Sequence, residues 1–168
     1  MYISVNAPNE ELYKKISRPV YEDGWQRLNE TLSMLKKLKT RTVIRFTQIK
    51  GMNDSEELLD QYSNLFESIQ SDFIEIKAFM FIGYSRKRLK IENMPSHEEV
   101  LMFAKKLERK LKSFEIIDEC EPSRIVLLKN KNSKLNNIII FNEPKYDEVD
   151  EITPKWKIYT LLKKYRKY

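Results

Sequence analysis

The chain has 168 residues, of which 41% are hydrophobic and 33% are charged, with only 3 Gly and 6 Pro. This composition excludes collagen-like, low-complexity and wholly disordered proteins and predicts one small globular unit. A single cysteine, Cys120, and a single histidine, His97, exclude an internal disulfide, a Cys-only zinc site, an iron–sulfur cluster and a multi-histidine metal site built by this chain alone. Another chain would have to bring the ligands for any metal or redox chemistry.

The charge of the chain is moderately positive. Lys and Arg number 31 against 25 Asp and Glu, and the net charge of +6 mildly favours a polyanionic partner. The sequence has no run of about 18 apolar residues for a membrane span, and its start, MYISVNAP, lacks the parts of a signal peptide. These features predict a cytoplasmic protein.

The first part of the sequence alternates strand patterns with helix patterns. Residues 2–7 alternate polar and apolar side chains, which predicts a strand that Pro8 ends. Asn9 is placed to cap a short helix, and residues 22–38 carry an apolar stripe at the three- and four-residue spacing of an amphipathic helix. Residues 41–49 are β-branched and aromatic, which predicts a buried strand.

The same order then follows a second time. Asp54, with Glu57 three residues later, resembles a capping box for the next helix. Residues 72–82 predict another strand, and a Ser-x-x-Glu capping box opens a helix over residues 96–112. Strands that alternate with helices predict a parallel sheet with right-handed crossovers.

The remainder of the chain is less regular. Residues 114–117, 124–128 and 137–141 have the composition of short strands, and we expect them to be antiparallel at a sheet edge. An acidic patch follows, and residues 154–168 carry six basic side chains and no acidic one. This last segment is predicted to be a short helix or a disordered arm.

One face of the three predicted parallel strands is polar. In a doubly wound sheet both faces of an inner strand are covered by helices and are therefore apolar. Here alternate positions bring six polar side chains to one face: Ser4, Asn6, Arg45, Thr47, Glu75 and Lys77. A barrel or part-barrel with outer helices and a polar, ligand-holding interior explains this asymmetry better than a closed core does. The alternative is a buried ion network of Arg45, Glu75 and Lys77.

The candidate ligand site lies where these strands end. Ligands of α/β folds bind beyond the carboxyl ends of the strands, which here are Asn6, residues 50–51 and residues 83–84. The glycines of the last two pairs are predicted to form backbone turns. A small barrel closes with about eight strands and a part-barrel needs about six, so three strands leave the polar face half exposed. We expect a further piece or a partner to complete it.

Six segments occur in the same order as in a known enzyme family. They are YISVNAP, ISRPVYEDGWQRLNETLSML, KTRTVIRFTQIKGMN, DFIEIKAFMFIGYSR, NMPSHEEV and ECEPSRIVLL, and they run from Tyr2 to Leu128. Over this range the chain resembles the tRNA 4-demethylwyosine synthases of archaeal type, which are radical S-adenosylmethionine enzymes of wyosine synthesis. It resembles the C-terminal half of that family. The family's CxxxCxxC loop for the 4Fe–4S cluster and its glycine-rich strand for the methionyl amine are not among these residues.

The resemblance implies a fold and a division of the chain. The fold is α/β, a partial radical S-adenosylmethionine (β/α) barrel in which this chain supplies the last three strands of a six-stranded part-barrel, with a C-terminal extension. Residues 1–95 would be the barrel half, residues 96–141 the family's extension with small edge strands, and residues 142–168 a charged tail.

The resemblance also implies an activity. The family's enzymes are lyases that cleave S-adenosylmethionine and condense pyruvate with N1-methylguanosine in phenylalanine tRNA, in the biosynthesis of wybutosine. Because the cluster ligands are absent here, an N-terminal half on a separate chain would have to act with this one, as a split or truncated enzyme. The alternatives are a degenerate, non-catalytic tRNA-binding paralogue and an α/β domain with an unrelated small ligand.

On the family pattern, three sets of residues have expected roles. Ser4, Asn6 and Arg45 would face the S-adenosylmethionine cofactor. Lys77 and Lys50 lie where a lysine could meet pyruvate, since a desolvated lysine amine can form a Schiff base with a keto acid; the family's lysine is one of these two or belongs to the missing half. Asn6 stands where the family has an aspartate, which keeps hydrogen bonding but loses a charge.

Candidate RNA contacts follow the third strand. Tyr84, Arg86 and Arg88 mix an aromatic ring with cations, as single-stranded RNA surfaces do, and Arg124 could add a phosphate contact; a solvated loop is the alternative. His97 falls in the first turn of a helix, where capping or a phosphate contact is favoured over catalysis, and Cys120 is predicted to be an unreactive buried or edge thiol.

Overall fold

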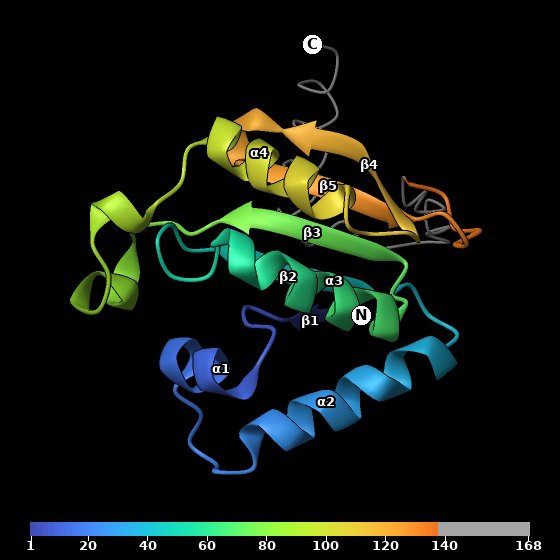
Figure 1. Cartoon of the computed structure of the whole chain (residues 1–168), viewed down its shortest axis with the longest axis horizontal. Coiled ribbons are helices and arrows are strands. Elements are labelled where there is room, and N and C mark those ends of the chain that lie inside the picture. The colour runs from blue at the N-terminus through green and yellow to red at the C-terminus, as the bar shows by residue number, and fades with distance from the viewer. Residues whose placement is uncertain (138–168) are drawn as a thin grey trace, which may run out of the picture. The chain divides into compact units, whose positions relative to one another are not determined.

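The computed structural model describes residues 1–137, which form one compact unit. Residues 138–141 of the predicted strand over residues 137–141, and the charged tail over residues 142–168, fall outside the described residues. The helices and strands in chain order are β1 (Tyr2–Ser4), α1 (Glu10–Ser17), α2 (Gly24–Met34), β2 (Val43–Gln48), α3 (Glu56–Ile69), β3 (Phe73–Ala78), α4 (His97–Glu108), β4 (Phe114–Cys120) and β5 (Ile125–Asn130), as Figure 1 shows.

The strands form one mixed sheet in the order β1-β2-β3-β5-β4. β1, β2 and β3 are parallel, while β5 runs antiparallel to both β3 and β4. The predicted alternation of strands and helices, the parallel sheet and the antiparallel strands at its edge are therefore confirmed. The fold is a mixed α/β unit whose five-stranded sheet is open.

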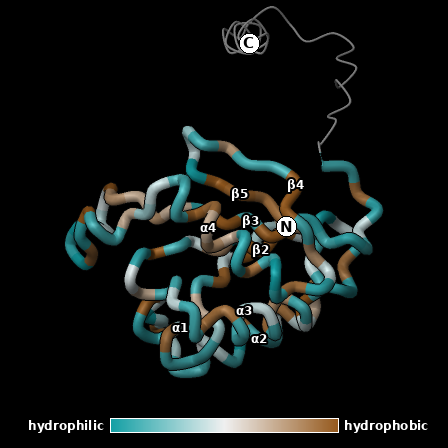
Figure 2. Tube along the Cα trace, turned by 45° about the horizontal axis from the view of Figure 1, so that its top comes forward, coloured by the Kyte–Doolittle hydropathy of each residue, from teal (hydrophilic) through white to brown (hydrophobic). Residues whose placement is uncertain are grey.

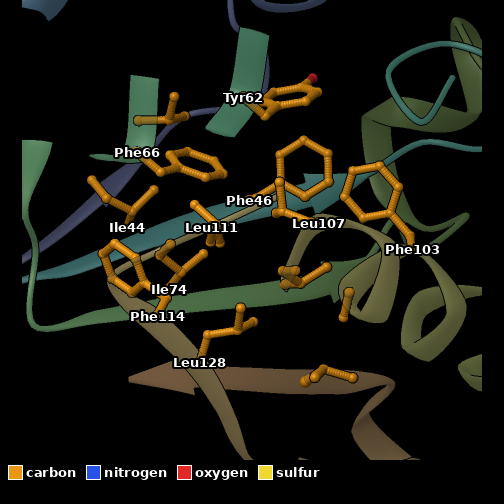
Figure 3. Packing of buried hydrophobic residues seen from close by; sticks show 14 of the residues in the cluster. Ile44, Phe46, Tyr62, Phe66, Ile74, Phe103, Leu107, Leu111, Phe114 and Leu128 are labelled. Atoms are coloured by element: carbon orange, nitrogen blue, oxygen red, sulfur yellow. The ribbon is translucent and has the colours of Figure 1, made fainter. Parts of the chain in front are cut away.

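The core lies between one face of this sheet and the helices. Figure 3 shows Ile44 of β2, Ile74 of β3 and Leu128 of β5 in one cluster with aromatic side chains of α3, α4 and β4. The ring of Phe46 stacks on Phe103 with centroids 5.2 Å apart. Each fully buried side chain of this size contributes about 1.5–3 kcal/mol of transfer free energy. In Figure 2 the strands run along one side of the unit and α1, α2 and α3 along the other.

Two of the three predicted helix caps are confirmed. Asn9 Oδ1 accepts from the Leu12 N–H at 3.0 Å, and Ser96 and Glu99 form the reciprocal capping box of α4. The capping box of Asp54 was a wrong prediction, because α3 begins after Ser55. Asp54 Oδ1 instead accepts from the Gly51 N–H at 2.8 Å and closes the turn after β2.

The third strand is shorter than its composition predicts. β3 ends at Ala78, and the Phe79 N–H makes a last bond to the Gln48 carbonyl of β2 at 2.8 Å. The Phe79 side chain packs with Ile16 and Ile49 in a second, smaller hydrophobic cluster. The chain turns after this segment at Gly83, whose φ of 56° lies in the left-handed region that favours glycine. Gly51 has the same kind of conformation, so both glycines form backbone turns as predicted. No helix within residues 1–137 is long and apolar enough to cross a membrane.

Candidate functional site

The predicted polar face is present, and the register of the sheet arranges it in rows. Ser4, Arg45, Glu75 and Leu127 are consecutive partners across β1, β2, β3 and β5. In the next row on this face, two residues further toward the carboxyl ends of β2 and β3, Thr47 pairs with Lys77, and Lys77 pairs with Ile125. These positions alternate with the core positions, so they share the face that is turned away from the core. The polar side chains therefore lie side by side across three parallel strands.

The middle of the amino-end row of the same face is apolar and covered. It holds Val43 and Phe73, which are buried. The guanidinium of Arg41 lies 4.9 Å from the Phe73 ring centroid and donates to the Asn136 carbonyl at 2.7 Å. Ser133 Oγ also donates to Asp72 at 2.7 Å, so the chain after β5 is fastened to the amino ends of β2 and β3. At the amino ends of β2 and β3 the face is therefore covered, while its polar rows lie toward the middle and the carboxyl ends.

Arg45 and Glu75 form an ion pair at the centre of this face. Arg45 Nε lies 2.7 Å from Glu75 Oε1, and the guanidinium also stands 4.9 Å from the Tyr2 ring centroid. The Glu75 side chain is 9% exposed and that of Arg45 is 41% exposed. The ion network weighed from the sequence therefore exists for these two residues. Lys77 is half-buried and has no ion-pair partner within the described part of the chain.

Asn6 is held from several sides. Its Oδ1 accepts from the Thr47 N–H at 2.9 Å, and its carbonyl accepts from Asn53 Nδ2 at 3.0 Å and from the Tyr62 hydroxyl at 3.3 Å. Burial raises the pKa of Tyr62 above its ordinary value, with a smaller contribution from Asp54, so this hydroxyl stays protonated as a donor. Asn53 and Tyr62 were not identified as site residues from the sequence. The only sequence signal for Asn53 is its place in the turn after Gly51. Tyr62 has the helical spacing of a core residue.

The two candidate lysines lie in different surroundings. Lys77 stands on the polar face, whereas Lys50 follows β2 and forms an ion pair with Glu99 in the first turn of α4. Hydrogen bonds from Lys50 and from the Ser96 N–H hold the pKa of Glu99 below its usual value. The backbone N–H of Lys50 also donates to the Asn93 carbonyl at 2.9 Å. Lys50 is therefore engaged at the start of α4.

Of the candidate RNA-binding residues, two are exposed on a turn and two donate hydrogen bonds to backbone carbonyls elsewhere in the fold. Tyr84 is 75% exposed on a short 3₁₀ turn, Gly83–Lys87, and the Lys87 ammonium lies 4.7 Å from its ring centroid. Arg86 is exposed on the same turn. Arg88 donates to the Ile16 carbonyl at 3.5 Å, and Arg124 donates to the Pro95 carbonyl at 3.1 Å. Tyr84 and Arg86 are thus exposed to solvent, while the side chains of Arg88 and Arg124 also form hydrogen bonds within the fold.

The remaining two sequence candidates lie at the start of α4 and on the edge strand β4. His97 Nε2 lies 3.1 Å from Glu119 Oε2, which links the start of α4 to β4, and Cys120 is exposed at the end of the edge strand β4. Among residues 1–137, no three His, Cys, Asp or Glu side chains group in a way that could hold a metal ion.

Comparisons with known proteins agree on one family. The family described as wyosine base formation matches residues 68–130. The chain is 43% identical over 128 residues to a tRNA 4-demethylwyosine synthase of Pyrococcus abyssi, covering 76% of this chain and 37% of that protein. It is 41% identical to the Methanocaldococcus jannaschii enzyme of the same name, covering 81% and 42%.

Two solved structures are similar as well. A TYW1 structure with a lysine–pyruvate adduct bound superposes with a TM-score of 0.71 at 38% identity, covering 80% of this chain and 42% of that one. A crystal structure of archaeal TYW1 gives a TM-score of 0.63 at 33% identity, with 80% and 40% coverage.

The mixed α/β fold of the described residues is thus similar to part of these TYW1 structures. Residues 68–130 match the wyosine base formation family, and the chain is similar to part of the tRNA 4-demethylwyosine synthases. It spans about two-fifths of the length of the archaeal relatives that it matches.

The residues present do not fit an iron–sulfur cluster. A 4Fe–4S cluster is held by cysteine thiolates, and this chain has one cysteine, which is exposed at the end of β4. The donor set of the polar face does fit a polar organic cofactor such as S-adenosylmethionine. The Ser4 hydroxyl, the Asn6 amide and the outward N–H groups of Arg45 match hydroxyl and carboxylate oxygens.

Proposed function

We propose that this chain forms the part of a tRNA 4-demethylwyosine synthase that supplies the last three strands of its part-barrel and its tRNA-recognising extension. The cluster-bearing strands would come from another polypeptide or from a longer form of this one. The observation that carries the proposal is the row of polar side chains across β1, β2 and β3, on an open face of the sheet in a chain similar to these synthases.

The place for the missing strands is the free edge of β1. Among the described strands β1 has a neighbour only on the β2 side, so its other edge has unpaired backbone groups. A parallel strand added there would extend the polar face next to Ser4 and enclose it. The single cysteine supports the same arrangement, because a three-cysteine cluster loop must then lie on the added strands.

Ser4, Asn6 and Arg45 are proposed to bind S-adenosylmethionine. When bound, this cofactor supplies a 5′-deoxyadenosyl radical in the family's chemistry. The contribution of the present residues is to bind and orient it. Arg45 is suited to a carboxylate because its guanidinium is fixed by Glu75 on one side and by the Tyr2 ring on the other, with further N–H groups left free.

Lys77 is the better placed of the two candidates for pyruvate. Its amine would attack the keto carbon, and loss of one water would leave a carbon–nitrogen double bond. Lys77 lies next to Thr47, on the polar face and without an ion-pair partner in the described residues, whereas Lys50 is paired with Glu99. A lysine–pyruvate adduct occurs in a related TYW1 structure, which supports a lysine role without assigning it to this chain.

The tRNA is proposed to approach the carboxyl ends of the strands. Tyr84 offers an exposed ring for base stacking, and Arg86, Arg88 and Arg124 offer cations for phosphates. The exposed turn of Tyr84 follows β3, so it stands at the same end of the sheet as Lys77.

The test is reconstitution with the missing strands. The chain is co-expressed with a polypeptide that carries CxxxCxxC, and the purified assembly is reduced and given S-adenosylmethionine, pyruvate and phenylalanine tRNA with N1-methylguanosine. We expect a coloured iron–sulfur complex that forms 4-demethylwyosine. Failure to form a complex, or a complex without product, overturns the proposal. Binding of tRNA without product would instead identify a non-catalytic tRNA-binding paralogue.

A further inference from the structure

A buried asparagine joins the ends of the first two strands. Asn53 has no solvent exposure, although it lies in the turn between β2 and α3. Its Nδ2 donates to the carbonyls of Asn6 at 3.0 Å and Thr47 at 2.9 Å, and its Oδ1 accepts from the Ile49 N–H at 2.7 Å. Both amide hydrogens and one acceptor position are therefore used, and all three partners are backbone groups at the carboxyl ends of β1 and β2.

These side-chain bonds stand where the strand ladder stops. The Val5 N–H still donates to the Arg45 carbonyl at 2.9 Å, as in a parallel ladder. The next N–H of β2, that of Thr47, donates to the side chain of Asn6 at 2.9 Å and not to a backbone carbonyl. Beyond Val5, the two strands are therefore connected through the amides of Asn6 and Asn53.

This arrangement decides which end of the Asn6 amide is available. The Thr47 N–H must have an acceptor, so Oδ1 of Asn6 faces it and the amide cannot be flipped. Within residues 1–137, no group accepts a hydrogen bond from Asn6 Nδ2. Asn6 thus presents a donor beside Thr47, one strand away from Lys77.

We propose that Asn53 is a positioning residue, which holds Asn6 and Thr47 so that Asn6 Nδ2 donates to an oxygen of the bound substrate or cofactor. This rests on the proposed function for the identity of the ligand. Asn53 itself is fully buried and acts only through the two strand ends that it joins. Tyr62 supports the same carbonyl of Asn6 from α3, so the position is held by the turn and by the core together.

Asn130 offers a matched control. It is also a buried asparagine, and its Nδ2 donates to the Ser71 carbonyl at 3.2 Å, but it lies at the amino-end side of β3, away from the candidate site. Asn53→Ala and Asn130→Ala therefore remove the same side chain from similar burial. A general loss of stability would affect both variants alike.

The first measurement is made on the 168-residue chain by NMR. In Asn53→Ala we expect the Asn6 side-chain amide signals to shift and exchange of the Thr47 N–H to accelerate by about tenfold or more, while Asn130→Ala leaves both unchanged. Equal effects in the two variants, or no effect in the first, overturn the proposal. If Asn53→Ala does not fold, Asn53→Asp keeps the size and the acceptor for Ile49, removes both donors, and is measured in the same way.

The second measurement uses the reconstituted assembly. Asn53→Ala is expected to raise KM for S-adenosylmethionine or for pyruvate by about tenfold, the loss of about one hydrogen bond, and to add nothing in an Asn6→Ala background. Additive effects of the two substitutions overturn action through Asn6. A wild-type assembly without activity would overturn the proposed function alone, because the NMR comparison still tests the positioning of Asn6.

Discussion

Arg45 Nε lies 2.7 Å from Glu75 Oε1, and the two residues are direct neighbours in the register of β2 and β3. The pair joins a nearly buried carboxylate to a cation that still reaches solvent. A buried carboxylate without a partner is costly, whereas an exposed guanidinium is hydrated by water. The pair therefore gives the nearly buried Glu75 carboxylate a partner within the sheet and leaves part of the Arg45 guanidinium available to a ligand.

This asymmetry predicts unequal costs of substitution. Arg45→Ala should lower the free energy of unfolding by about 2–4 kcal/mol, since it leaves the Glu75 carboxylate unpaired. Glu75→Gln should cost only about 1 kcal/mol, because Arg45 is 41% exposed and is solvated when its partner is lost. Urea denaturation of both variants measures the difference. The reverse order of the two costs would contradict this account of the pair.

The second prediction concerns the lysine that meets pyruvate. The reconstituted assembly is incubated with pyruvate and cyanoborohydride, which reduces a carbon–nitrogen double bond to a stable amine. Peptide mass spectrometry should find the adduct on Lys77, and Lys77→Ala should abolish it while Lys50→Ala leaves it in place. An adduct on Lys50, or one confined to the cluster-bearing strands, would show that Lys77 does not carry the reaction.

The third prediction is a pH dependence that arises from Asp72. Burial alone would raise its pKa, but hydrogen bonds from Ser133 and Thr42 outweigh burial and hold the pKa below the ordinary value of 3.8. The carboxylate therefore contributes stability at pH values above 3.8, and this contribution is lost as the pH falls through the lowered pKa of the folded state.

Asp72→Asn tests this directly. It should lower the free energy of unfolding at neutral pH by about 1 kcal/mol and reduce the further loss of stability in acid. Thr42→Val removes one donor to the same carboxylate and should reduce the acid dependence by a smaller amount. It also removes the acceptor of the Asp72 N–H, so it should lower stability at every pH. The measurement is thermal or urea unfolding at a series of pH values. An unchanged acid dependence in Asp72→Asn would mean that another group is responsible.

The fourth prediction concerns tRNA binding by the turn after β3. Tyr84→Ala should weaken binding by about 1–3 kcal/mol through the loss of base stacking. Arg86→Ala should reduce the slope of log K against log salt by about 1 through the loss of a phosphate contact. Lys37→Ala, which changes an exposed lysine on the turn before β2 at the opposite end of the sheet, is the control and should change neither. Filter binding at several salt concentrations distinguishes these outcomes. Equal effects of Arg86→Ala and Lys37→Ala, with none from Tyr84→Ala, would indicate binding by charge alone.

Much of the fold could be predicted because it depends on local periodicity. The period-two pattern placed Ser4, Arg45 and Glu75 on one face before any coordinates, and the structure confirms that face through the sheet register. The caps at Asn9 and Ser96 were also predictable, since each depends on side chains within three residues of the cap. The roles proposed for these residues toward ligands stay predictions.

Other features depend on contacts between distant parts of the chain. Asp54 does not cap α3 because the turn of Gly51 competes for its carboxylate, and the pairing of Lys50 with Glu99 depends on how α4 packs beside the end of β2. Asn53 reads as one more polar residue in a turn until folding brings the carbonyl of Asn6, 47 residues away, within 3.0 Å of its amide.

The sequence by itself therefore determined the elements, their order and the polar face, because backbone geometry repeats every two or 3.6 residues and side chains follow that repeat. Only the tertiary structure decided which polar groups are already engaged. Lys77 stands on the face without an ion-pair partner among residues 1–137, while Lys50 is paired with Glu99. The physical reason is that hydrogen bonds and ion pairs are satisfied by whichever partner the packed chain brings near, and no local pattern specifies that partner.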